Sequence, residues 1–198
     1  MTDVEQLRAH QLAAIAVGGS AGSIEALMEL LPWLPATLAV PVTVVVHLPP
    51  AAERGLAPVL ASACALTVVE AEDKMTLQPG WMYVAPADYH LLVERGRTLA
   101  LSADPPVHFS RPSIDVLFES AAFAFGRLSL AILLSGANAD GAAGLATVKA
   151  HGGLTWVQEP ASARVPHMPE AALALTSHSV RRIDDMGRTL AEWGYAGA

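Results

Sequence analysis

Three polar residues stand at the ends of predicted strands, and their side chains are those that nucleophilic catalysis uses. Ser20 follows an apolar run that ends in glycine, His47 follows a run of valines, and Asp140 directly precedes a predicted helix. Carboxyl ends of parallel strands meet at one edge of a sheet, so residues distant in the chain can lie together there. Serine, histidine and carboxylate can act as nucleophile, general base and the group that orients the base. We therefore take Ser20, His47 and Asp140 as candidate catalytic residues.

The segment around Ser20, residues 18–22, reads Gly-Gly-Ser-Ala-Gly and matches the pattern G-x-S-x-G of a nucleophile on a sharp strand-to-helix turn. Five small residues occur often by chance, and the order Ser, His, Asp along this chain differs from that of ordinary α/β-hydrolases. A glycine-rich turn can also hold a nucleotide phosphate. That alternative is weaker, because serines replace the second and third glycines of the dinucleotide fingerprint and His47 replaces its acid.

Each candidate also has a purely structural interpretation. Ser20 can simply open the first helix, Asp140 can N-cap the helix that follows it, and His47 can be a polar strand terminus. The remaining histidines lack metal-ligand spacing, so we expect no metal site. We expect Cys64 to be a core residue in an apolar helix, and the pair Asp184–Asp185 to cap a helix or lie in solvent.

The elements that must position these residues alternate between strand and helix. This alternation predicts an α/β fold, a doubly wound and mostly parallel sheet flanked by helices, with an antiparallel hairpin in the middle. We expect residues 1–12 to be a polar lead-in and residues 13–198 to form a single domain. Strands are expected at 13–17, 42–46, 66–69, 80–84, 90–93, 98–101, 128–134, 154–157 and 179–183. Helices are expected at 24–31, 52–63, 114–125, 141–150, 169–175 and 185–193, with Pro112 near the first turn of the third helix.

Composition excludes several other classes of protein. Of 198 residues, 53% are hydrophobic and 16% charged, which predicts a large core rather than disorder. The net charge of −7 disfavours binding to a nucleic-acid backbone, and the single cysteine excludes a disulfide framework. The most apolar run, residues 38–48, is far shorter than the roughly 20 residues that span a bilayer. With no secretory signal at the N-terminus, we expect a cytoplasmic protein that does not insert into membranes.

Taken together, these motifs resemble the CheB family, the protein-glutamate methylesterases of bacterial chemosensory systems. The resemblance runs from about residue 13 to residue 183, and its segments follow one another in the family's order. They are Ile-Ala-Val-Gly-Gly-Ser-Ala-Gly at 15–22, Val-His-Leu-Pro-Pro at 46–50, Tyr-Val-Ala-Pro-Ala-Asp-Tyr-His-Leu at 83–91, Arg-Pro-Ser-Ile-Asp-Val-Leu-Phe at 111–118, Leu-Ser-Gly-Ala-Asn-Ala-Asp-Gly at 134–141 and His-Met-Pro at 167–169.

The resemblance implies that Ser20 is the nucleophile, His47 the general base and Asp140 its orienting carboxylate. The family hydrolyses γ-methyl esters of glutamate on the helical cytoplasmic domains of chemoreceptors, and it also deamidates certain receptor glutamines. No metal or organic cofactor is implied. Backbone N–H groups near Ala21 and Ala137 would stabilise the oxyanion.

The chain departs from the family around this expected pocket. Ala21 replaces a threonine, and Ser135, Ala137 and Asn138 replace residues of the segment T-G-M-G-x-D-G. His167 replaces a glycine before Met168, and we expect it to be a bystander rather than a second base. These changes keep two alternatives open: a degenerate, non-catalytic module that binds a receptor or signalling partner, and an esterase for small molecules.

Family members typically carry an N-terminal receiver domain, for which residues 1–12 are too short. We therefore expect either a stand-alone esterase, unregulated or controlled in trans by a response regulator, or an excised catalytic piece.

Overall fold

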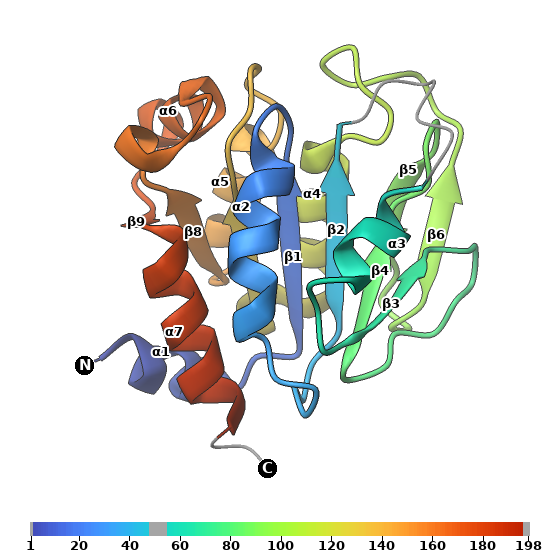
Figure 1. Ribbon diagram of the computed structural model, residues 1–198. Coiled ribbons are helices and arrows are strands. Elements are labelled where there is room, and N and C mark those ends of the chain that lie inside the picture. Colours follow the sequence, from blue (N-terminus) through green and yellow to red (C-terminus); the bar gives the residue numbers. More distant parts are fainter. Residues whose placement is uncertain (1, 48–54, 196–198) are drawn as a thin grey trace.

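The computed structural model describes residues 2–47 and 55–195, which form a parallel sheet between two layers of helices (Figure 1). Seven parallel strands lie in the order β3-β4-β2-β1-β7-β8-β9, and β5 pairs with β6 in a separate antiparallel sheet. The strands are β1 (Ala14–Gly19), β2 (Val42–Val46), β3 (Thr67–Glu70), β4 (Trp81–Val84), β5 (His90–Val93), β6 (Leu99–Ser102), β7 (Ser129–Leu133), β8 (Leu154–Gln158) and β9 (Ser179–Arg181). The α-helices are α1 (Asp3–His10), α2 (Ser23–Leu30), α3 (Leu56–Ala61), α4 (Ile114–Phe125), α5 (Ala142–Ala150), α6 (His167–Leu175) and α7 (Ile183–Tyr195).

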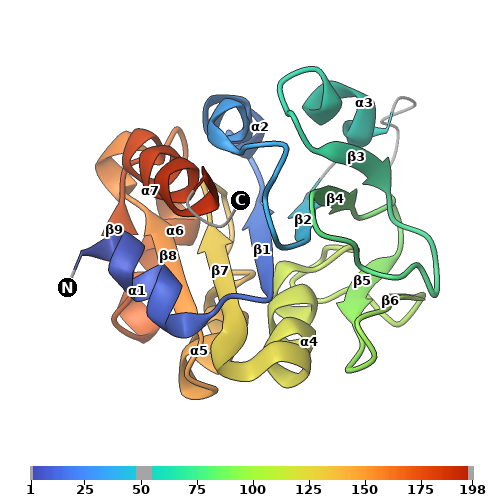
Figure 2. The same cartoon turned by 90° about the horizontal axis from the view of Figure 1, so that it is seen from below.

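The central strand β1 is buried on both faces, and its alternating side chains enter two separate cores. Ile15 and Val17 pack in the core beneath α1, α2, α3 and α7. Ala14 and Ala16 face the core formed with α4, α5, α6 and the β5–β6 hairpin. The view from below separates these two layers on either side of the sheet (Figure 2). A strand covered on both faces explains the continuous apolar runs in the sequence.

The predicted fold class is confirmed, including the antiparallel hairpin, which is β5–β6. One difference lies at the N-terminus, where the polar stretch contains α1. Thr2 and Glu5 form a capping box at its start, and the fully buried Leu7 joins the core beside α7. A capping box satisfies two N–H groups at the start of a helix, so a largely polar segment can still form one.

Several predicted boundaries move by a few residues. The described part of the predicted helix 52–63 is only α3, residues 52–54 lying outside the described ranges, and Cys64 follows its last turn, partly buried against the first core. Pro112 lies directly before Ser113, the N-cap of α4, and so near the first turn as expected. Near the C-terminus, α6 begins at His167, β9 ends at Arg181 and α7 begins at Ile183.

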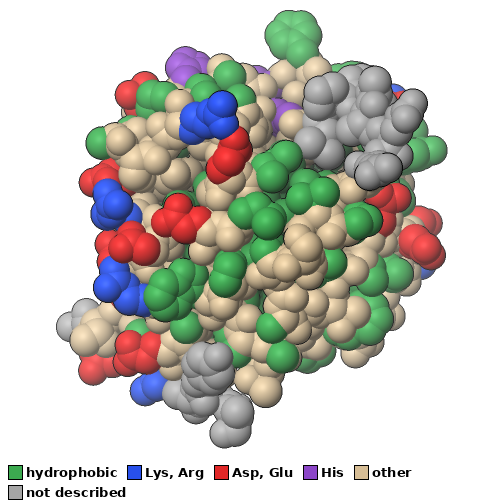
Figure 3. All heavy atoms as spheres, viewed as in Figure 1, with side chains coloured by type: hydrophobic (Ala, Val, Ile, Leu, Met, Phe, Trp, Pro, Cys, Tyr) green, Lys and Arg blue, Asp and Glu red, His purple; other side chains and the backbone are tan. Residues whose placement is uncertain are grey.

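Helix α7 carries Asp184 and Asp185 in its first turn, where both form ion pairs with Arg188. Charged side chains gather along this side of the face shown in Figure 3, whereas the middle of that face is largely uncharged. No helix among the described residues is long and apolar enough to cross a membrane.

The strand order places the candidate residues near one another. From β1 the chain continues to β2 on one side, and it later returns to β7 on the other side of β1. Such a reversal creates a crevice at the carboxyl edge of the sheet, where ligands of open α/β folds bind. The segments that follow β1, β2 and β7 contain Ser20, His47 and Asp140.

Candidate active site

Ser20 lies in the turn that joins β1 to α2. Its backbone N–H donates to the carbonyl of Ser135 (2.9 Å), and its own carbonyl accepts hydrogen bonds from the N–H and the hydroxyl of Ser23 (3.0 and 2.6 Å). Gly22, with φ +80°, is the N-cap of α2, so Ser20 is not the cap of this helix. Glycine adopts this left-handed backbone conformation without strain, which lets the chain turn sharply after Ser20.

His47 directly follows β2 and extends the pairing of β2 with β1, because its N–H donates to the carbonyl of Gly19 (3.1 Å). That bond places the backbone of His47 beside Ser20. The imidazole is nine-tenths buried, and its Nε2 lies 2.7 Å from Oδ2 of Asp140. The structure therefore joins two of the three predicted residues through their side chains.

Asp140 is fully buried and is held by the N-terminus of α4. Its Oδ2 also accepts a hydrogen bond from the N–H of Ile114 (2.7 Å), and its Oδ1 accepts from the N–H of Asp115 (3.0 Å) and the hydroxyl of Ser113 (2.8 Å). Burial opposes the charge, but the hydrogen bonds from His47 and these groups outweigh it and lower the pKa of Asp140. An ionised Asp140 only accepts hydrogen bonds, so Nε2 of His47 carries a proton.

The purely structural interpretation of Asp140 as the N-cap of α5 is wrong. The N-cap of α5 is Gly141, which has no side chain of its own to cap the helix. Instead, Asp115 in α4 reaches across, and its Oδ1 accepts hydrogen bonds from the N–H groups of Gly141 (2.9 Å) and Gly144 (2.7 Å). The carboxylate of Asp140 faces α4 and His47.

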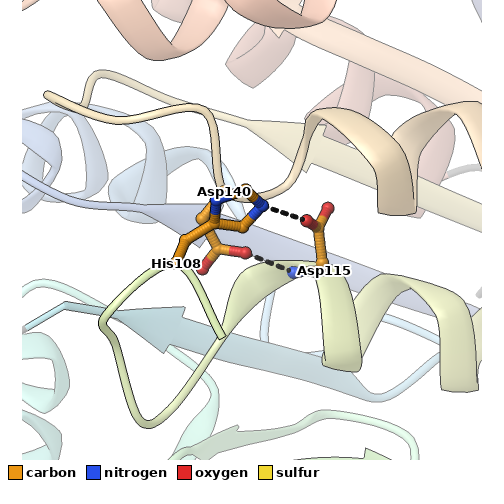
Figure 4. Close-up of side chains that lie close together, drawn as sticks. All are labelled: His108, Asp115 and Asp140. Carbon is orange, nitrogen blue, oxygen red and sulfur yellow. Dashed lines mark hydrogen bonds and ion pairs between the residues drawn. The ribbon is translucent and has the colours of Figure 1, made fainter. Parts of the chain in front are cut away.

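His108 and Asp115 lie close to Asp140. One side-chain nitrogen or oxygen atom of each of these three residues is within 4.8 Å of the others (Figure 4). Nε2 of His108 is 3.3 Å from Oδ2 of Asp115. Burial raises the pKa of Asp115. The hydrogen bond from the N–H of Gly144 lowers this pKa, but the nearby charge of Asp140 raises it again, so the net shift is upward. Both oxygens of Asp140 and Oδ1 of Asp115 face N–H or O–H donors. That donor set fits a hydrogen-bonded network better than a cation.

The sequence analysis missed three residues around the predicted group. Ser113 carries the one clear signal, because a serine just before an apolar helical pattern is a typical N-cap, and the structure confirms that role. Asp115 and Ser110 have no local signal. Ser110 lies in a proline-rich loop, yet its Oγ is 3.3 Å from Nδ1 of His47.

The predicted oxyanion residues lie on two neighbouring loops. The carbonyl of Ala21 accepts a hydrogen bond from the hydroxyl of Ser135 (2.7 Å), which fixes the turn, and Ala137 is exposed. Within the described residues, the backbone N–H groups of Ala21 and Ala137 donate no hydrogen bond. Both groups are therefore available to stabilise a developing negative charge.

His167 and Met168, which the family motif placed at the expected pocket, are the first two residues of α6. His167 is exposed at the start of α6, with no hydrogen bond in the described parts of the chain to Ser20, His47 or Asp140. Met168 is fully buried, and its N–H donates to the carbonyl of Gly136 (2.9 Å). Met168 thus supports the loop that carries Ala137 from below.

Known proteins resemble this chain over most of its length. The family model described as CheB methylesterase matches residues 15–190. The crystal structure of the CheB methylesterase catalytic domain of Thermotoga maritima superposes with a TM-score of 0.82 and 28% sequence identity, covering 94% of this chain and 99% of that one.

Two curated relatives extend this result. A putative protein-glutamate methylesterase/protein-glutamine glutaminase of Leptospira interrogans is 42% identical over 164 residues, 83% of this chain and 85% of the relative. A protein-glutamate methylesterase/protein-glutamine glutaminase of Burkholderia pseudomallei is 41% identical over 180 residues, 89% of this chain but only 49% of the relative. With a matching family model, a shared fold and these identities, the chain belongs to the CheB methylesterase family.

Proposed function

We propose that this protein is a serine hydrolase that removes methyl esters from glutamate side chains of chemoreceptors. The hydrogen bond between Nε2 of His47 and the buried carboxylate of Asp140, at the strand end beside Ser20, carries this proposal. Relatives named as protein-glutamate methylesterases support the choice of reaction over the non-catalytic alternative.

In the proposed mechanism, Oγ of Ser20 attacks the ester carbonyl carbon while Nδ1 of His47 takes the hydroxyl proton. Asp140 keeps the proton on Nε2, so that Nδ1 is the nitrogen able to accept. The N–H groups of Ala21 and Ala137 stabilise the tetrahedral oxyanion, and each such donor is worth about 10²–10³ in rate.

Collapse of this intermediate breaks the bond to the methoxy oxygen, and His47 returns the proton to release methanol. The glutamyl side chain is left as an ester of Ser20. Water then attacks that ester, His47 acts again as general base, and glutamate is released. The same steps with ammonia as leaving group convert a glutamine side chain to glutamate. That second activity appears in the names of two of the relatives.

The partners that we propose are the helical cytoplasmic domains of chemoreceptors as substrate and a response regulator acting in trans. The reaction would accordingly take place in the cytoplasm. The relative from Myxococcus xanthus named protein-glutamate methylesterase FrzG, 36% identical over 180 residues, supports the substrate class. Co-purification of a tagged protein with phosphorylated and unphosphorylated regulators would test the second partner.

The test of the reaction is release of labelled methanol from methyl-labelled receptor by the wild type and by Ser20→Ala. We expect the variant to lose about 10⁴–10⁶ in kcat. Equal release by both proteins would rule out Ser20 as nucleophile. Turnover of short acyl esters without turnover of receptor would instead favour a small-molecule esterase.

A further inference from the structure

The general base of the proposed mechanism contacts a second serine. Nε2 of His47 donates to the ionised Asp140, so Nδ1 is the ring nitrogen that can accept a proton from Ser20. In the structure, the hydroxyl that faces Nδ1 belongs to Ser110 (3.3 Å). Among the described residues, no hydrogen bond joins the hydroxyl of Ser20 to His47.

A tight turn, residues 107–110, positions Ser110 beside His47. Val107 and Ser110 exchange two backbone hydrogen bonds (3.1 and 2.9 Å), and the two residues between them, His108 and Phe109, have φ values of +49° and +61°. Two-residue turns of this kind normally use Asn-Gly, because left-handed backbone is unfavourable for most other residues. His108 and Phe109 therefore hold the turn in a strained conformation.

Contacts on both sides hold this strained turn against His47. His108 pairs with the buried Asp115, as Figure 4 shows. On the other side, the guanidinium of Arg111 donates to the carboxylate of Asp88 and to the carbonyls of Ala103 and Asp104. Strained backbone that is fixed by its surroundings is concentrated at functional sites.

The same turn presents an apolar side chain to solvent. Phe109, next to Ser110, is fully exposed at 104% of its reference area, more than any other large hydrophobic residue in the described ranges. Displacement of Phe109 would also move Ser110, the next residue in the chain.

We propose that Ser110 is a specificity-determining residue, whose hydroxyl competes with Ser20 for Nδ1 of His47 until a bound protein substrate moves the turn of residues 107–110. This inference rests on the proposed roles of Ser20 and His47. In the free enzyme, Ser110 donates to Nδ1 and keeps the base from the nucleophile. A receptor helix that packs on Phe109 shifts the turn and frees Nδ1, whereas a small ester leaves the turn in place.

The strength of the hydrogen bond from Ser110 to His47 determines how much its removal should change the rate. A hydrogen bond of this kind contributes about 1 kcal/mol, which corresponds to about a fivefold change in rate. We therefore expect Ser110→Ala to hydrolyse p-nitrophenyl acetate about fivefold faster than the wild type, and its Ser20 to react faster with a fluorophosphonate. Turnover of receptor methyl ester should change by much less. Ser110→Thr, which keeps a hydroxyl, should restore the slow reaction with the small ester.

A measurement without turnover tests the contact itself. The ¹⁵N resonance of Nδ1 of His47 should move toward that of a free acceptor nitrogen in Ser110→Ala, but not in Ser110→Thr. Phe109→Ala should raise KM for receptor and leave KM for p-nitrophenyl acetate unchanged. An unchanged Nδ1 resonance, or a slower small-ester reaction in Ser110→Ala, would overturn the inference.

The outcomes also separate this inference from the proposed function. If Ser20→Ala abolishes receptor turnover while Ser110→Ala changes neither the resonance nor the small-ester rate, only the inference is wrong. If the fluorophosphonate labels Ser110 in wild-type protein, as found by peptide mass analysis, then Ser110 is the nucleophile and both are wrong.

Discussion

Asp140 holds the N-terminus of α4, the helix of Asp115, and Asp115 in turn holds the N-terminus of α5, the helix that follows Asp140. Asp140, just before α5, accepts hydrogen bonds from the first N–H groups of α4. Asp115, in the first turn of α4, accepts hydrogen bonds from N–H groups at the start of α5. A buried N–H left without an acceptor costs about 1–3 kcal/mol. The carboxylate that orients the proposed base is thus part of the packing of two helices.

We expect Asp140→Asn to lower kcat by about 10⁴. The new amide NH₂, in place of Oδ2, would face Nε2 of His47 and the N–H of Ile114, while Oδ1 would still accept from Ser113 and Asp115. Two donors cannot pair, so the ring proton of His47 would move from Nε2 to Nδ1. A protonated Nδ1 can no longer accept the proton of Ser20. Methanol release from receptor measures the loss.

The matched control for this change is Asp115→Asn. Its amide oxygen can still accept from Gly141 and Gly144, and Asp115 does not contact His47 through its side chain. We expect this variant to keep kcat within about tenfold of the wild type. Equal losses of kcat in both variants would show that the effect comes from helix packing and not from the tautomer of His47.

The lowered pKa of Asp140 predicts how stability depends on pH. Because the folded state lowers this pKa below its ordinary value of 3.8, ionised Asp140 contributes stability above that value. The contribution is lost as the pH falls through 3.8 toward the folded pKa. Urea unfolding of the wild type and Asp140→Asn should therefore differ most at pH 7 and less at pH 3. A difference that grows on acidification would contradict this sign.

The order and type of the helices and strands could be predicted because the period of apolar residues and the length of each apolar segment are local features of the sequence. In runs such as residues 42–46 every residue but Thr43 is apolar, which is typical of a strand buried on both faces. Helix α1 could not be predicted in this way. Its residues are mostly polar, and the buried Leu7 contributes only after α7 packs against it.

For the site, sequence patterns could locate residues at strand ends but not their partners. Ser20, His47 and Asp140 stand out because each is polar where an apolar element ends. The exchange of hydrogen bonds between α4 and α5, and the contact of Ser110 with His47, depend on how distant segments pack. The position of Met168 likewise depends on packing, since its N–H donates to the carbonyl of Gly136 in the loop that carries Ala137.

Gly144→Ala should destabilise the protein although alanine favours helices. A Cβ at Gly144 would lie 2.7 Å from Cβ of Phe118 and 3.0 Å from backbone atoms of Asp115. Overpacking of this kind costs about 1–3 kcal/mol, more than the roughly 1 kcal/mol gained from helix propensity. Thermal unfolding checks the sign. Gly96→Ala, where the nearest atom is 3.7 Å away, is the control and should change stability by less than about 0.5 kcal/mol.

Phe109→Gly should stabilise the protein by about 0.5–1 kcal/mol, since glycine relieves the left-handed backbone and the exposed ring buries nothing. Phe123→Gly provides the contrast. Phe123 is also exposed (58%) but lies inside α4, where glycine should destabilise by about 1 kcal/mol. Denaturant midpoints of the two variants should move in opposite directions. A loss of stability in both would show that the turn is not strained.

Ser135→Ala should reduce kcat about tenfold by loosening the turn that carries Ser20. The buried hydroxyl of Ser135 donates to the carbonyl of Ala21 (2.7 Å) and accepts from the N–H of Val165 (2.9 Å), so it fixes the residue after Ser20, the proposed nucleophile. Ser129→Ala is the matched control, since Ser129 is equally buried and bonds a backbone carbonyl at the opposite end of β7. Both variants should lose about 1–3 kcal/mol of stability. Only Ser135→Ala should slow methanol release and fluorophosphonate labelling of Ser20; a similar slowing in Ser129→Ala would assign the effect to general destabilisation.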